Sequence, residues 1–277
     1  SGIVDASSVQ FNNAIVDQNL ALINDCDETE LGSSDASCGM SGPANFVGPI
    51  AQSSSNQIGG ETDGATIDQS NDAQVSQIFG AVNNCDEAGI GDNTPNCSNV
   101  GDNFIESISQ ANNADVGDDF VQNNLVAISQ NVQETNDCDE LGDGNNDPTC
   151  FNIADNTIEP VDQANAATGT EVTDISQGNH IASMNQDIVA VNDCDQSGPG
   201  DNNAECGNTA ENRADPLTQE NAATGHFFSD IFQDNDAAYS QVIDLNNDCD
   251  ETTLTLTIED NEATCGTNAL NHIVDAS

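Results

Sequence analysis

The sequence predicts an all-β fold: a β-solenoid of about five repeats of ~55 residues, each carrying a disulfide-closed loop. Two observations predict it: a cysteine pair that recurs along the chain, and residues of fixed type at even spacing before each pair. Residues 1–277 are expected to form one array. Its repeats lie at about 1–38, 39–97, 98–150, 151–206 and 207–265, and a partial repeat lies at 266–277.

The cysteines set the period of the array. Consecutive first cysteines lie 59, 53, 56 and 55 residues apart, and no cysteine falls outside a pair. One disulfide per repeat is therefore predicted, which indicates an oxidising, extracellular compartment. Zinc is the competing interpretation, but these pairs are wider than the usual Cys-x2-4-Cys and the histidines lie outside them. The pairs are Cys26/Cys38, Cys85/Cys97, Cys138/Cys150, Cys194/Cys206 and Cys249/Cys265.

The residues before each first cysteine predict strands with one inward face. Apolar residues stand six and ten positions before it, and Ala or Val stands twelve before it, including Ala182. These offsets are even, and side chains at even spacing on a strand share a face. The same face holds Gln eight positions before the cysteine and Asn two before it: Gln18, Gln77, Gln130, Gln186, Gln241, Asn24, Asn83, Asn136, Asn192 and Asn247.

Stacked repeats explain why amide side chains would face inward. A buried amide is costly unless it is hydrogen-bonded, and identical amides stacked above one another bond along the stack as a ladder. His180 stands where other repeats place Asn, so it is expected to complete a ladder. A weaker copy, Gln-x-Asn-x-Ala, recurs at 110–114, 163–167 and 219–223, so each repeat should contain at least two strand-bearing arcs.

One motif in these arcs resembles a known family. The Asn-x-Ala-x3-Gln stretch at 12–18, 71–77 and 235–241 is similar to the core of the curlin repeat, the unit of secreted amyloid-like bacterial fibres. The resemblance covers about a third of the chain and implies a fibre with inward amide ladders. This chain departs from the pattern in its longer repeat, a shorter turn and its cysteine loops.

Composition excludes several partners. The formal net charge of -48 would repel nucleic acid and anionic membranes. No apolar run approaches the ~20 residues of a membrane helix, so no membrane insertion is expected. No signal peptide is seen either, so Ser1 is expected to follow a processing cut. The polar, charged composition would also suit disorder, which the strict repeat argues against.

The two ends of the sequence predict self-assembly. Residues 3–7 and 273–277 both read Ile-Val-Asp-Ala-Ser, and the two terminal segments together nearly compose another repeat. Ile3, Val4, Ile273 and Val274 are therefore expected to form a joint between head-to-tail copies, because such open contacts make filaments. The alternative is that the shared pentapeptide is a chance remnant of the repeat.

The loop after each first cysteine is acidic. Oxygen ligands in a closed loop suit Ca²⁺, although the spacing matches neither an EF-hand nor a Gly-Gly-x-Gly-x-Asp roll. The alternative is a solvated rim that keeps filaments soluble. The possible calcium ligands are Asp27, Glu28, Asp86, Glu87, Asp139, Glu140, Asp195, Asp250 and Glu251.

The leading functional hypothesis is a secreted structural protein that polymerises head to tail into an extracellular filament, as in a biofilm or on a cell surface. The alternative is a monomeric or surface-tethered acidic solenoid that acts as an adhesin or calcium-binding module. An enzyme is not expected, because the chain has no lysine and His226 and His272 are isolated. An ice-binding solenoid would need a flat threonine array, and one local cluster at 252–257 does not supply it.

Overall fold

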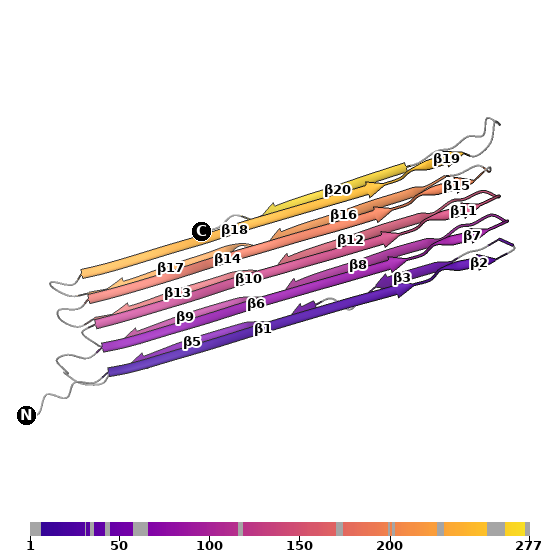
Figure 1. Cartoon of the computed structure of the whole chain (residues 1–277). Helices are drawn as coiled ribbons and strands as arrows, with labels where there is room; N and C mark the ends of the chain where they lie inside the picture. The colour runs from indigo at the N-terminus through magenta and orange to yellow at the C-terminus, as the bar shows by residue number, and fades with distance from the viewer. Residues whose placement is uncertain are drawn as a thin grey trace, which may run out of the picture.

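The computed structural model describes residues 7–30, 32–33, 36–41, 45–57, 66–115, 119–169, 174–198, 200, 203–225, 230–253 and 264–274. In these residues it contains twenty β-strands and no helix, and every strand pairing is parallel. The predicted all-β solenoid is confirmed. Figure 1 shows five flat coils stacked side by side, with the long strands in front of the returning ones.

Each repeat makes one coil. A long outgoing strand carries it to a narrow tip: β1 (Ser7–Asp25), β6 (Thr66–Asn84), β10 (Asp119–Asp137), β14 (Asp174–Asp193) and β18 (Asp230–Asp248). A short tip strand follows: β2 (Glu28–Glu30), β7 (Glu87–Gly89), β11 (Glu140–Gly142), β15 (Gln196–Gly198) and β19 (Glu251–Thr253).

Two further strands return beneath the long one. The first set is β3 (Ser37–Ser41), β4 (Asn45–Val47), β8 (Asn96–Ile105), β12 (Thr149–Ile158), β16 (Glu205–Ala214) and β20 (Thr264–Ile273). The second set is β5 (Ile50–Gln57), β9 (Ile108–Asp115), β13 (Val161–Thr168) and β17 (Leu217–Thr224). The outgoing and return strands enclose a thin interior, so the coil has two main walls.

Register follows the cysteine period. Strand β6 pairs with β1 over nineteen residues, and Cys97 and Cys150 are register partners on the return side. Each residue therefore lies above its equivalent one repeat earlier, at the ~4.8 Å spacing of hydrogen-bonded strands. The long strands form a sheet of order β1-β6-β10-β14-β18, in which β1 and β18 are the outer strands.

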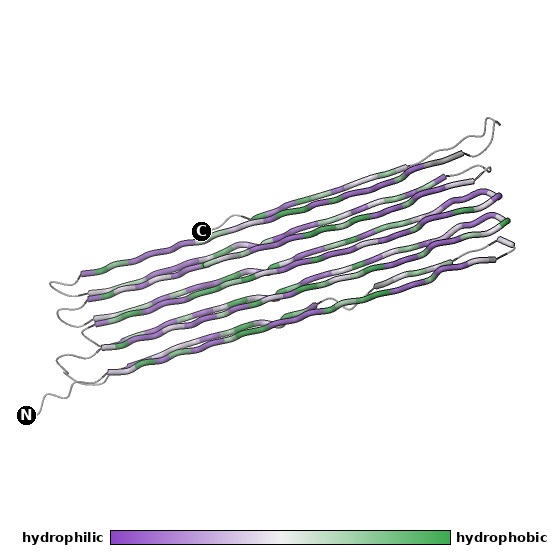
Figure 2. Tube along the Cα trace, in the orientation of Figure 1, coloured by the Kyte–Doolittle hydropathy of each residue, from purple (hydrophilic) through white to green (hydrophobic). Residues whose placement is uncertain are grey.

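The interior is built from alternating residues, and Figure 2 shows hydropathy changing along each strand. In β6 the even-offset residues predicted to face inward are buried, and the intervening ones are more exposed. Aliphatic columns form separate clusters, one around Val75, Ile128 and Met184 and another around Phe79, Val132 and Ile188. Amide columns lie between them, so the core is a series of narrow apolar and amide stripes.

A β-bulge in β14 overturns two of the expectations. The register with β10 shifts after Val126, so Asn179 rather than His180 joins the Asn column. Ile181 takes the buried position beside Val126, and Ala182 is exposed. The extra residue explains why Gln177 stands one position off in the sequence and yet bonds to Gln122 in the ladder, at 2.8 Å.

The disulfides tie each tip together. The structure joins Cys26–Cys38, Cys85–Cys97, Cys138–Cys150, Cys194–Cys206 and Cys249–Cys265, with Cα atoms 6.2 to 6.8 Å apart. Each links the end of an outgoing strand to the start of its return strand. The sulfurs of successive coils form one continuous buried cluster.

Candidate functional site: the end faces and the acidic groove

The glutamine columns have a direction. In each, the Nε2 of one Gln donates to the Oε1 of the Gln one coil earlier. Gln77 donates to Gln18 at 2.9 Å, and Gln241 donates to Gln186 at 2.7 Å. The same direction holds in the columns that begin at Gln10 and Gln52.

The asparagine columns run the opposite way. Asn12 Nδ2 donates to Asn71 Oδ1 at 2.8 Å, and each later Asn donates to the next coil as far as Asn235. The predicted Asn column, two residues before the first cysteine of each pair, donates in this same direction from Asn83 as far as Asn247. Asn24 is the register partner of Asn83 and begins the column. Because the two kinds of column are antiparallel, their summed amide dipoles oppose each other.

Two asparagine columns on the return side were missed in the sequence. Their signal was present, because Asn stands two and six residues after the second cysteine in most repeats. These columns bond coil to coil in the same direction as the other asparagine columns. A third return-side column contains Asn112, Asn165 and Asn221, within the weaker Gln-x-Asn-x-Ala copy.

The ladders end on two complementary faces. On the N-terminal face, formed by β1 to β5, the Nε2 of Gln18 donates one hydrogen to Phe46 O at 2.9 Å, and an amide nitrogen carries two. On the C-terminal face, formed by β17 to β20, no N–H in the described part of the chain donates to Oε1 of Gln233 or Gln241. The first face thus offers a Gln donor, and the second offers the matching acceptor.

Each face also leaves the core half-open. Val16, Leu20 and Leu22 on the N-terminal face are partly buried against the aliphatic clusters. Their register equivalents on the C-terminal face are Tyr239, Ile243 and Leu245, also partly buried. Unpaired strand edges with exposed apolar side chains favour pairing with another chain.

The predicted joint residues are only partly visible. Ile3 and Val4 lie outside the described residues. Ile273 ends β20 with 47% of its surface exposed, and Val274 donates its N–H to Ala214 O at 3.0 Å. The C-terminal pair therefore continues the return wall of the last coil.

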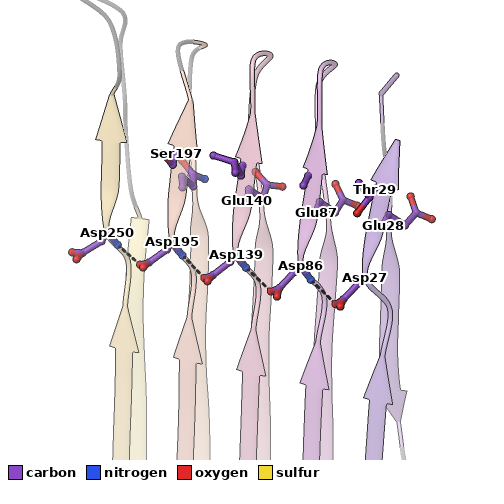
Figure 3. A pocket seen from close by; sticks show the side chains of 13 residues that line it. Asp27, Glu28, Thr29, Asp86, Glu87, Asp139, Glu140, Asp195, Ser197 and Asp250 are labelled. Carbon is purple, nitrogen blue, oxygen red and sulfur yellow. Dashed lines mark hydrogen bonds between the residues drawn. The ribbon is translucent and has the colours of Figure 1, made fainter. Parts of the chain in front are cut away.

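The acidic tips form a groove along the stack, which we call the acidic groove. It runs past Asp27, Asp86, Asp139, Asp195 and Asp250. Each of the first four accepts the backbone N–H of its equivalent in the next coil, at 3.3 to 3.4 Å, and Asp250 ends the series. Figure 3 shows these carboxylates pointing to one side of their strands, with Glu87 and Glu140 pointing to the other.

Among the described residues, the groove concentrates negative charge with no lysine or arginine beside it. Arg213 is the sole lysine or arginine in the sequence, and it pairs with Asp215 at 2.7 Å. Burial, reinforced by Asp139, Asp86, Asp193 and Asp195, raises the pKa of Asp137 to about 6. Burial also raises the pKa of Asp86, Asp139 and Asp193, with neighbouring carboxylates adding to it.

Three sets of carboxylates in the groove fit a hard cation. Their oxygens lie within 4.8 Å of one another, about twice a Ca²⁺–oxygen distance, so one ion could contact all three. The sets combine predicted residues with flanking ones: Asp86, Asp137 and Asp139; Asp139, Asp193 and Asp195; Asp195, Asp248 and Asp250.

The glutamates predicted as ligands are placed differently. Glu87 and Glu140 are each 2% exposed and stack inside the tip, where Glu87 accepts the N–H of Ala36. Burial, with Glu87 and Asp147 adding to it, raises the pKa of Glu140 to about 9. Glu28 is exposed at the end of this column, and the side chain of Glu251 lies outside the description.

One buried acid gave no signal in the sequence. Glu134 is 1% exposed and lies in register between Ala81 and Ala190; among the described residues only the backbone of Ile153 lies close enough to offset its burial, and no side chain pairs with it. Burial, with Asp102 and Asp155 adding to it, raises the pKa of Glu134 to about 9. Gly101 leaves room for it, because a Cβ there would lie 2.8 Å from Glu134 Oε1.

Two observations bear on relationships and on location. In the part of the chain that the structure describes, no helix has the length and apolar character needed to span a membrane. No family model, curated protein or solved structure matches this chain. The resemblance to curlins therefore remains an expectation from the sequence.

Proposed function

We propose that this chain is a secreted structural protein that polymerises head to tail into an extracellular, amyloid-like β-solenoid filament. The observation that carries the proposal is the complementary polarity of the two end faces. In a head-to-tail stack, Gln18 of one copy donates to Gln241 of the preceding copy, and Asn235 of the preceding copy donates to Asn12. Like columns of two N-terminal faces would instead set Gln donor against Gln donor and Asn acceptor against Asn acceptor.

The same stacking would bury the open core. Leu20 would pack over Ile243 of the neighbouring copy as it packs over Phe79 within its own. Because this contact joins two different faces, each addition recreates the free face, and the product is an open filament. The disulfides favour an oxidising compartment, and the carboxylates would keep filaments apart in solution.

The test compares two substitutions on neighbouring residues of β1. Leu20 faces the half-open core, and Ala21 is exposed on the outer face. Electron microscopy and sedimentation should show wild-type filaments whose length grows with protein concentration. Leu20→Glu should abolish them, because it places a carboxylate in the joint, and Ala21→Glu should retain them.

Circular dichroism should show β-structure in both variants, since four coils are untouched. Wild-type protein that stays monomeric at every concentration would overturn the proposal. Filaments that persist in Leu20→Glu would also contradict the joint described here.

Divalent cation binding in the acidic groove is a second proposed property. The observation that favours it is the three sets of aspartate oxygens, which lie close enough to share an ion and have no basic side chain beside them. Isothermal titration with Ca²⁺ tests it, and the absence of binding heat at millimolar Ca²⁺ would exclude it.

A further inference from the structure

The disulfides do not stand alone in their repeats. The Sγ atoms of Cys97, Cys138 and Cys150 all lie within 4.8 Å of one another, and so do those of Cys150, Cys194 and Cys206. Each of these sets contains one disulfide and one sulfur from the preceding coil. A cysteine in this column is therefore close to a disulfide other than its own.

The backbone would also accept the alternative pairing. Cys38, Cys97, Cys150, Cys206 and Cys265 are successive register partners in one parallel sheet. Adjacent strands place such partners ~4.8 Å apart, inside the usual Cα–Cα range of disulfides, about 4.4 to 6.8 Å. A bond between neighbouring coils thus needs no large movement of the chain.

The column is open to reagents at its ends. The inner pairs, such as Cys138–Cys150, are 0% exposed. At the C-terminal face Cys249 is partly buried and Cys265 is exposed, while at the N-terminal face Cys26 is partly buried. A small thiol can therefore reach the last disulfide of the column while the inner ones are shielded.

We propose that this column supports disulfide exchange across the subunit joint, which makes the filament covalent. The inference rests on the proposed head-to-tail assembly. In that assembly Cys249 and Cys265 of one copy take the positions next to Cys26 and Cys38 of the following copy. Cys265 then lies beside Cys26 and Cys38 as Cys97 lies beside Cys138 and Cys150, whose sulfurs are within 4.8 Å of one another inside a single chain.

The exchange balances with a low-molecular-weight thiol as catalyst. On a free copy, its thiolate attacks Cys249, which breaks Cys249–Cys265, forms a mixed disulfide and releases the Cys265 thiolate. Once the copies are assembled, the Cys265 thiolate attacks Cys38 of the following copy, which forms Cys265–Cys38 and releases the Cys26 thiolate. The Cys26 thiolate then attacks Cys249, which forms Cys249–Cys26 and regenerates the small thiolate.

Two intramolecular disulfides thereby become two intermolecular ones, without net oxidation or reduction. The number of disulfides is unchanged, and the product can no longer separate at that joint. The exchange proceeds because the assembled joint holds Cys265 beside the Cys26–Cys38 disulfide, which raises the effective concentration of the attacking thiolate far above that of free copies.

The experiment lets free copies assemble in the presence of a catalytic amount of reduced glutathione, which can reach their terminal disulfides, and then alkylates free thiols. Non-reducing denaturing electrophoresis should give a ladder of covalent multimers, and mass spectrometry should find a peptide linked through Cys249–Cys26. The Cys26→Ser/Cys38→Ser variant should form filaments that denature to monomers. The matched control, Cys138→Ser/Cys150→Ser, keeps both terminal pairs and should retain the multimers.

Electron microscopy of the same samples separates the two proposals. Filaments that denature entirely to monomers, with only the five intramolecular pairs in the peptide map, would overturn the exchange and leave the assembly standing. Absence of wild-type filaments would overturn both. The wild-type peptide map decides the exchange even if the end variant fails to assemble.

Discussion

The direction of the amide ladders makes a sharp prediction about two residues of one strand. Gln18→Glu retains the oxygen that accepts from Gln77 and removes the donor directed out of the N-terminal face. Asn12→Asp does the reverse, because it keeps the outward acceptor and removes the donor that bonds to Asn71 at 2.8 Å. Both changes replace an amide by a carboxylate of nearly the same shape and add the same charge. They differ mainly in whether the lost hydrogen-bond donor points out of the face, as in Gln18, or toward the next coil, as in Asn12.

The expected magnitudes follow from these contacts. In the filament, the Gln18→Glu variant would set a carboxylate against the Oε1 of Gln241, leaving a buried acceptor unsatisfied. That costs about 3 kcal/mol, or roughly a hundredfold increase in the critical concentration for assembly. In the free monomer the change removes one exposed bond to Phe46 O, worth about 1 kcal/mol at most. Asn12→Asp should instead weaken the monomer and loosen β1 from β6.

Sedimentation at graded protein concentrations gives the critical concentration, and hydrogen exchange of β1 amides gives the stability of the first coil. Gln18→Glu should change the first quantity and Asn12→Asp chiefly the second. Equal increases in critical concentration, with unchanged exchange in both variants, would refute the reasoning, because charge alone would then explain the effect.

Three other predictions concern the buried acid, its neighbours and the groove. Because the pKa of Glu134 is about 9 when folded and 4.5 in the reference state, folding retains a proton that the unfolded chain loses above pH 4.5. Its contribution to the free energy of unfolding should therefore fall as pH rises from 4.5 to 9, by about 3 kcal/mol at pH 7. In urea unfolding, Glu134→Ala should reduce the loss of stability between pH 5 and pH 8, and Glu140, whose pKa is also raised to about 9, should account for part of what remains. Gly101→Ala would press a Cβ onto the ring of Phe79 and should lower the free energy of unfolding by about 1–3 kcal/mol. The double variant with Phe79→Leu should recover most of this loss. If the effects of the two substitutions simply add, this packing is contradicted. Calcium should raise the melting temperature, and chelation should reverse the increase. The increase should be smaller in Asp139→Asn, because the Asp139 carboxylate belongs to two of the three sets. Equal increases in the wild-type protein and in Asp139→Asn would place calcium binding elsewhere.

The period and the inward face could be predicted because a stacked coil constrains sequence strongly. A residue such as Gln77 has the same neighbour above and below, so its type repeats with the cysteines and its burial shows as even spacing. The sequence did not predict that each repeat makes a single winding. One long strand with a broken return would leave the same sequence period as several shorter windings.

The exceptions to the repeat were harder to predict. The bulge in β14 depends on one added residue whose position the sequence does not mark, so His180 and Ala182 were assigned to the wrong face. Glu134 stands between Ala81 and Ala190 in an otherwise apolar column, and its burial depends on room left by Gly101 across the interior. Such choices depend on contacts between distant segments, which a local pattern does not contain.

The parallel register has a mechanical consequence. Each backbone and amide bond between coils runs along the stack, at right angles to the strands, so a pulling force on the stack would act on many of them at once. Between β1 and β6 alone, nineteen residue pairs share the load. The stack should therefore resist tension by loading these bonds simultaneously and fail abruptly at one plane rather than unzip bond by bond.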